Sequence, residues 1–302
     1  MQKNIKKEIE QIWESIAGEK YPISSEMHDF SSIINEFEES SIGHALQMLQ
    51  PWIAILEQEI QWLACLHASL DSAVNRRSGD QVCHALDALI GTAASHAVAI
   101  RRLCLSGLDS TAKIVLRVMA ETFSVCIAIL WNSELRRNFT KPQSLEQAQD
   151  FWFKYFARGK LEKILENAEA SILGLDDEIR NELRDCRKEQ VKWLSQYVHP
   201  SYVAAILTAM PQAIAEPGMH RIGTLGLCSS ASIGTLDAAN KAIWYFSRVG
   251  CHLMFRETKQ PFHVIDPNDE IDRLVVLGKE VLHVLVSRHW DDHKEKLDKY
   301  LL

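Results

Sequence analysis

Arg117, Glu121 and His199 combine the side-chain types that could cleave a phosphodiester without a metal ion. A guanidinium can hold a phosphate or a carboxylate bidentately, an imidazole exchanges protons near neutral pH, and a carboxylate can orient either group. In such a site His199 would remove the proton of a ribose 2′-hydroxyl, and Arg117 would stabilise charge on the phosphorus oxygens. These residue types predict a pocket for a phosphate- or carboxylate-bearing ligand.

The same three residues also have a simpler structural explanation. Arg117 and Glu121 have the spacing of an i,i+4 ion pair, and His199 can cap a helix or satisfy a hydrogen bond in the core. Both charges fall close to the apolar arc of their helix, so we expect them to be partly buried and therefore paired. Because structural networks of this kind are commoner than catalytic ones, we place the structural explanation first and keep both open.

Metal-binding and common enzyme motifs are incomplete in this sequence. His289 and His293 stand one helical turn apart, but Trp290 occupies the place at which an HExxH zinc hydrolase has its glutamate. Glu280 and His283 have the spacing of half a di-iron site, without a second Glu-x-x-His. The chain also has no Walker A loop, GxGxxG fingerprint or GxSxG elbow. We expect no metal and no cofactor.

The elements that must position Arg117 and His199 are helices. A helix is expected from Leu108 to Trp131, and one from Val82 to Leu105 precedes it, with Asp80 as its N-cap and Gly107 after its last turn. The short connection predicts an antiparallel hairpin. His199 precedes Pro200, which biases it out of helical geometry at the end of a helix over 178–197.

Helical patterns cover most of the remaining chain. A capping box at 144–147 starts a helix with a dense aromatic run over 151–156. That run could stack on nucleic-acid bases, but few basic residues interleave with it, so a core or a subunit interface is preferred. Residues 216–235 are rich in Gly and Ser and predict a loop. Further helices are expected over 2–17, 52–70, 232–258 and 268–300.

The composition agrees with a helical globular protein. Of 302 residues, 47% are hydrophobic and 24% are charged, and only 13 Gly and 8 Pro are present. We predict an all-α, multi-helix bundle of about ten helices, with an N-terminal helical appendage over 1–40 and a bundle domain over 41–302. The net charge of -7 argues against nonspecific coating of nucleic acid, which depends on basic surface.

Cysteine usage and hydropathy predict a cytoplasmic protein. The seven Cys form no CxxC pair, and most lie in apolar helical runs where a free thiol behaves as a small hydrophobe. Residues 1–10 lack the apolar core of a signal peptide. The two most apolar windows, 108–131 and 198–215, are interrupted by charges or by Pro, so we expect neither to span a membrane.

The chain resembles a broad, mostly bacterial family of helical proteins of unknown function, which is distantly similar to HEPN-type proteins. The resemblance covers roughly residues 85–260 and rests on Gly107, Ser110, Ala112, Leu116, Arg117, Glu121, His199, Pro200 and Ser201. It implies a helical, HEPN-like bundle, a dimer, and an RNA-directed role in toxin or antiviral defence systems. HEPN nucleases, however, carry Arg and His four to six residues apart on one helix, and Arg187 and His199 are too far apart for that. Nuclease residues therefore do not carry over from HEPN proteins to this chain.

Two functional hypotheses follow. The first is a cytoplasmic defence- or toxin-related homo-oligomer that acts on RNA or a nucleotide, with His199 as base, Arg117 as anion clamp and Glu121 beside it. Its substrate would also contact Arg102, Ser110 and Ser201. The second is a non-catalytic module that binds a partner protein and in which the Arg/Glu/His set is structural.

Overall fold

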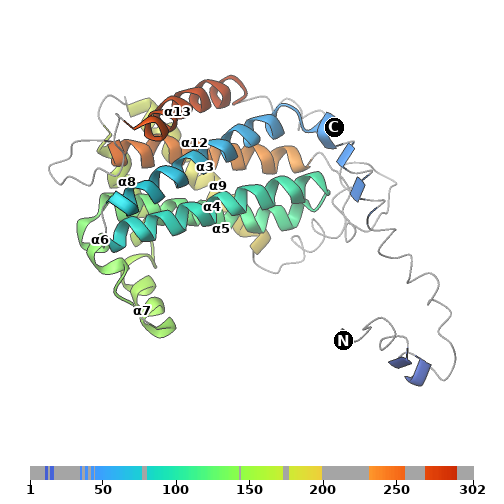
Figure 1. Cartoon of the computed structure of the whole chain (residues 1–302), viewed down its shortest axis with the longest axis horizontal. Coiled ribbons are helices and arrows are strands. Elements are labelled where there is room, and N and C mark those ends of the chain that lie inside the picture. The colour runs from blue at the N-terminus through green and yellow to red at the C-terminus, as the bar shows by residue number, and fades with distance from the viewer. Residues whose placement is uncertain are drawn as a thin grey trace.

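A computed structural model of the chain describes residues 11–12, 14–16, 35, 38–39, 42–43, 45–76, 80–142, 144–172, 177–198, 231–255 and 269–290. Within these residues the regular elements are helices and no strand occurs, so the predicted all-α fold class is confirmed (Figure 1). Nine helices have bounds there. They are α3 (Trp52–Arg76), α4 (Gln81–Leu105), α5 (Asp109–Trp131), α6 (Ser133–Phe139), α7 (Leu145–Tyr155), α8 (Lys160–Ala170), α9 (Asp177–Val198), α12 (Ala231–Phe255) and α13 (Glu270–Arg288).

The hairpin of α4 and α5 forms as the sequence predicts. Asp80 caps α4 by accepting hydrogen bonds from the backbone amides of Val82 at 3.0 Å and Cys83 at 3.4 Å. At the other end the chain turns at Gly107, whose φ of 74° is the left-handed conformation that glycine adopts without strain. The amide of Leu108 donates to the carbonyl of Leu103, which closes a Schellman motif. Local sequence therefore fixes where α4 ends and α5 begins.

Helix α5 lies at the centre of the bundle and packs on α4, α12, α9, α8 and α6. Its Phe123 stacks on Phe246 of α12, with ring centroids 4.5 Å apart, and Trp62 of α3 meets Phe246 edge-on at 6.3 Å. These rings join three helices through one buried aromatic cluster.

Two helices in the described part of the chain, α4 and α5, are long and apolar enough to cross a membrane by length and composition. The same length and composition suit a core helix, and half of the most apolar window of α5 is buried inside the bundle. The helices alone are weak evidence for a membrane span.

Helix α13 closes the bundle on one side. Its backbone carbonyl at Val275 accepts a hydrogen bond of 3.0 Å from the indole nitrogen of Trp62, and its buried Asp272 accepts one from the hydroxyl of Ser69. Both donors belong to α3, so α13 is attached to α3 at two points, which lie about two helical turns apart on α3 and about one turn apart on α13.

Three local predictions were incomplete. No helix was expected between residues 131 and 144, but α6 forms over Ser133–Phe139, where the Asn132 side chain caps it. The chain breaks after the aromatic helix at Arg158 and Gly159, both with positive φ, so α8 is a separate element. The last helix ends at Arg288, with His289 as its C-cap, rather than running to residue 300.

Candidate functional site

Arg117 holds α5 against α9. Its Nε and Nη2 both lie 2.7 Å from Oε1 of Glu121, and its Nη1 donates to the carbonyl oxygen of Val191 at 3.0 Å and to Oγ of Ser195 at 2.7 Å. The Ser195 hydroxyl in turn donates to the Val191 carbonyl at 2.6 Å. The predicted i,i+4 ion pair is confirmed, and every guanidinium nitrogen has a partner within the protein.

The pair lies at the edge of the bundle rather than sealed inside it. The side chain of Arg117 is 21% exposed and that of Glu121 is 42% exposed. A half-exposed pair needs little desolvation, so two charges are tolerated on an otherwise apolar helix. The prediction of partial burial is met at this edge.

The other predicted site residues are placed differently. Ser110 is buried in the first turn of α5, and Arg102 is exposed in the last turn of α4. Among the described residues, Arg102 makes none of the contacts that surround Arg117. His199 and Ser201 lie outside the described residues, so the contact between His199 and Arg117 stays a prediction.

A second charged pair, which we did not predict, lies one to two turns before Arg117 on α5. Lys113 donates to Oδ2 of Asp109 at 2.6 Å, and Oδ1 of Asp109 accepts a hydrogen bond of 2.6 Å from the Thr235 hydroxyl of α12. Lys113 and Asp109 are both buried. The Lys113 ammonium also lies over the rings of Tyr197, 4.2 Å from the centroid, and Trp193, 5.1 Å away. The available signal was the i,i+4 spacing of Asp109 and Lys113, repeated by Arg117 and Glu121.

The surroundings of Lys113 keep it charged. Burial by itself lowers the pKa of the ammonium, but Asp109 and the Tyr197 ring and hydroxyl more than offset this, so the pKa is raised above its ordinary value. A lysine in this state cannot act as a neutral nucleophile or base near pH 7. The arrangement attaches the start of α5 to α9 and α12.

Arg187, the arginine nearest to a HEPN-like position, belongs to a buried network between α8, α9 and α12. Its Nε donates to Oε1 of Glu169 at 2.9 Å, and its Nη1 donates to Glu162. The hydroxyl of Tyr245 donates to the same Glu169 oxygen at 2.6 Å. Burial lowers the pKa of Arg187, but the neighbouring acidic groups outweigh it and the net shift is upward. The Arg187 guanidinium is therefore hydrogen-bonded within the protein.

The residues of the two incomplete metal motifs are engaged in other contacts. Glu280 pairs with Arg248 and Lys279, and Nδ1 of His283 accepts a hydrogen bond of 3.3 Å from the Trp244 indole. His289 caps α13, and His293 lies outside the described residues. Among the described residues no three His, Cys, Asp or Glu side chains are grouped to hold a metal ion.

One buried acid stands apart from these networks. Glu59 of α3 is fully buried, and neither of its carboxylate oxygens has a hydrogen-bond partner among the described residues. Burial raises the pKa of Glu59 well above its ordinary value, and the nearby Asp237 raises it further. The sequence gives no sign that Glu59 is buried. Its neighbours at helical spacing are apolar, Leu56 and Trp62 among them.

The chain matches no protein-family model, no curated protein sequence and no solved structure. The resemblance to HEPN-type proteins therefore stays a prediction that rests on the residues quoted for it.

Proposed function

We propose that this helical bundle is a non-catalytic interaction module, in which Arg117 and Glu121 serve the fold. The observation that carries the proposal is the full occupation of the Arg117 guanidinium by Glu121, Val191 and Ser195. A phosphate would have to displace Glu121, a carboxylate already held in charge-assisted hydrogen bonds, before it could bind bidentately.

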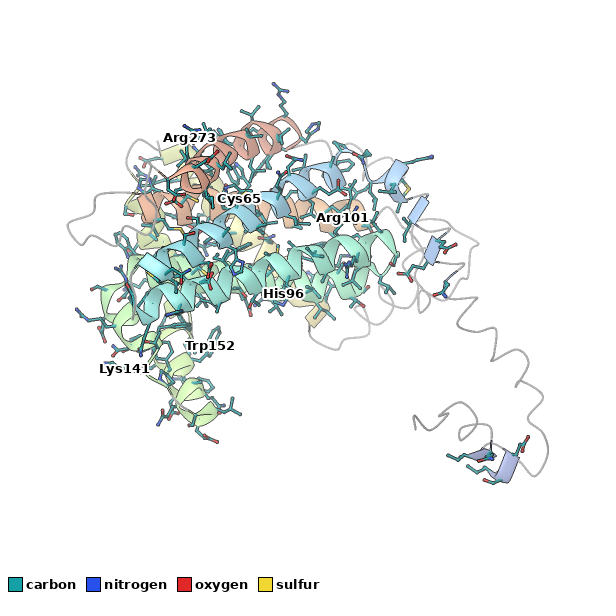
Figure 2. All side chains as sticks on the ribbon, viewed as in Figure 1. Cys65, His96, Arg101, Lys141, Trp152 and Arg273 are labelled. Carbon is teal, nitrogen blue, oxygen red and sulfur yellow. The ribbon has the colours of Figure 1, made fainter. Side chains whose placement is uncertain are left out.

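Helix α7 supplies a surface of the kind that partner proteins bind. It extends from the body of the bundle (Figure 1), and none of its residues is fully buried. Phe151 packs on Phe139 and Phe156. Trp152, labelled in Figure 2, lies against Phe156 with its ring partly exposed, and Phe153 is 55% exposed. Exposed aromatic side chains are enriched at interfaces and carry much of the binding energy there. We place the expected homo-oligomer contact or partner protein on this helix.

A second candidate function is the metal-independent cleavage of RNA or a nucleotide in a toxin or antiviral defence system. It is favoured by the partial exposure of Arg117 and Glu121, which leaves the pair open to a ligand. In the sequence His199 follows Tyr197 by two residues, and Tyr197 covers the neighbouring Lys113. This candidate keeps His199 as general base and Arg117 as anion clamp.

Two measurements, each made on wild type and on Arg117→Ala, separate these functions. For wild type and Arg117→Ala we would follow both RNA cleavage, with and without a chelator, and unfolding in urea. The interaction module predicts intact RNA for both proteins and a lower free energy of unfolding for Arg117→Ala. RNA cleavage by wild type that is lost in an equally stable Arg117→Ala variant would overturn it.

The role of α7 has its own assay. Phe153→Ala, at the more exposed of the two rings, should shift the sedimentation coefficient of the protein toward that of a monomer, with an unchanged urea midpoint. Leu145→Ala, at an exposed position on the same helix, is the matched control. If the aromatic variant sediments like wild type, the oligomer contact does not lie on α7.

A further inference from the structure

An apolar groove runs between α3 and α13, away from the contacts of Arg117. Its volume is about 280 Å³, and its walls include Trp62 and Cys65 from α3 and Leu274, Leu277 and Val281 from α13. In Figure 2 the labelled Cys65 lies on α3 beside α13. The groove is thus lined on both sides by side chains that favour an apolar occupant.

The exposed face of α13 extends the groove into a stripe. Leu274, Leu277, Val281 and Val284 recur at intervals of three and four residues, and each is between 47% and 56% exposed. Such spacing places the four side chains in one row along the helix. A contiguous exposed apolar row of this kind marks an interaction surface, and its dimensions suit the apolar face of one helix.

The chain itself contains a segment with a matching face. Between residues 2 and 17, Ile5, Ile9, Ile12, Trp13 and Ile16 recur at helical spacing. The described positions in this segment, 11–12 and 14–16, are helical. Ile12 is 51% exposed and Ile16 is 74% exposed there, so this face also has apolar surface left to bury.

The connection to the bundle is long enough for this segment to reach the groove. Glu38 accepts a hydrogen bond of 2.8 Å from Ser106, which anchors the chain at the end of α4. Five residues earlier on α4, about 7.5 Å along its axis, Arg101 pairs with Glu57. Glu57 adjoins Gln58, which lines the groove. In the structure residues 11–12 and 14–16 lie apart from the bundle (Figure 1). Residues 17–37 can span up to about 70 Å when extended, so the length of the chain permits the segment to fold back onto α3.

We propose that residues 2–17 dock as an amphipathic helix in the α3–α13 groove of the same chain. Burial of the isoleucine face against Leu274, Leu277 and Val281 drives the association. A tether of roughly 20 residues gives an effective concentration near the millimolar range, so the chain's own segment outcompetes a second copy at micromolar protein.

Cys65 provides a native reporter for this contact because it lies in the groove as a free thiol. Ile12→Cys and Ile16→Cys would each be oxidised in the full-length protein, and the linked peptides identified by mass spectrometry. A disulfide forms only when the two Cα atoms come within about 7 Å. We expect at least one of these variants to link to Cys65 at least tenfold faster than Glu14→Cys, whose side chain projects from the opposite face.

Three further variants serve as controls for this test. Cys65→Ser in the Ile12→Cys or Ile16→Cys background should abolish the link. Leu277→Glu, at an exposed position, should slow it at least tenfold while leaving the urea midpoint of the bundle unchanged, and Leu145→Glu on α7 should have no effect on the link. Equal linking rates for Glu14→Cys and the isoleucine variants, no link to Cys65, or a dimer-sized product would each overturn the proposal, the last in favour of a segment supplied by a second copy.

Discussion

Arg187→Met tests whether the buried network of α8, α9 and α12 stabilises the fold as its geometry indicates. Arg187 is 5% exposed and is the partner that neutralises Glu169, which is itself buried. Methionine has a similar length and no charge, so the variant removes the guanidinium and leaves an apolar side chain in its place. Among the described residues, Glu169 then keeps its hydrogen bond from Tyr245.

The expected loss is large for one substitution. Removing one partner of a buried ion pair costs about 3–5 kcal/mol, because the remaining charge stays desolvated and uncompensated. For a chain of this size that corresponds to a fall of roughly 6–20 °C in Tm. The matched control is Lys188→Met on the same helix. Lys188 makes half-exposed ion pairs with Glu166 and Glu162, which solvent screens and which should therefore contribute little to stability.

Urea unfolding followed by circular dichroism measures the loss. Glu169→Leu combined with Arg187→Met should recover much of it, because no buried charge remains. The reasoning fails if Arg187→Met is no less stable than Lys188→Met.

Three further predictions concern single positions. Glu59→Gln should make the free energy of unfolding less dependent on pH between about pH 4.5 and 7.5. The raised pKa of Glu59 means that its contribution to stability is present below the unfolded pKa and is lost as the pH rises, whereas glutamine does not titrate. Parallel urea midpoints for variant and wild type over this range would contradict this prediction. Asp80→Ala should lower the free energy of unfolding by about 1 kcal/mol, since two backbone amides of α4 lose their cap, and an unchanged urea midpoint would count against it. Gly107→Ala should lower it by about 1 kcal/mol through strain at positive φ, and calorimetry showing equal or higher stability would refute that explanation.

Helix ends were predictable where a side chain or a glycine fixes them locally. Asp80 and Ser144 both cap the helices that the sequence assigns to them, and Gly107 turns the chain where expected. The break at Arg158 was missed because an arginine carries no signal for positive φ, and that conformation depends on the packing of α7 and α8 around it. The sequence marks the end of a helix only where a nearby side chain supplies the capping hydrogen bond or a glycine supplies the backbone conformation.

The candidate site was predictable along one helix but not between helices. The spacing of Arg117 and Glu121 is sufficient to predict their pairing. The partners of Arg117 on α9, Val191 and Ser195, lie more than 70 residues further along the chain. No periodicity within α5 contains that information, because it depends on how two helices cross.

Polar groups connect the helices of this bundle where apolar packing alone would allow one helix to slide along another. Asp109 meets Thr235 of α12, Arg117 meets Ser195 of α9, and Asp272 meets Ser69 of α3. Each contact is directional, so a shift of one helical turn would leave a desolvated donor or acceptor without its partner. Because apolar side chains repeat along every helix and tolerate such shifts, these polar contacts select one register. Glu59 lacks such a partner in the described part of the chain, so its burial lowers stability without selecting a register.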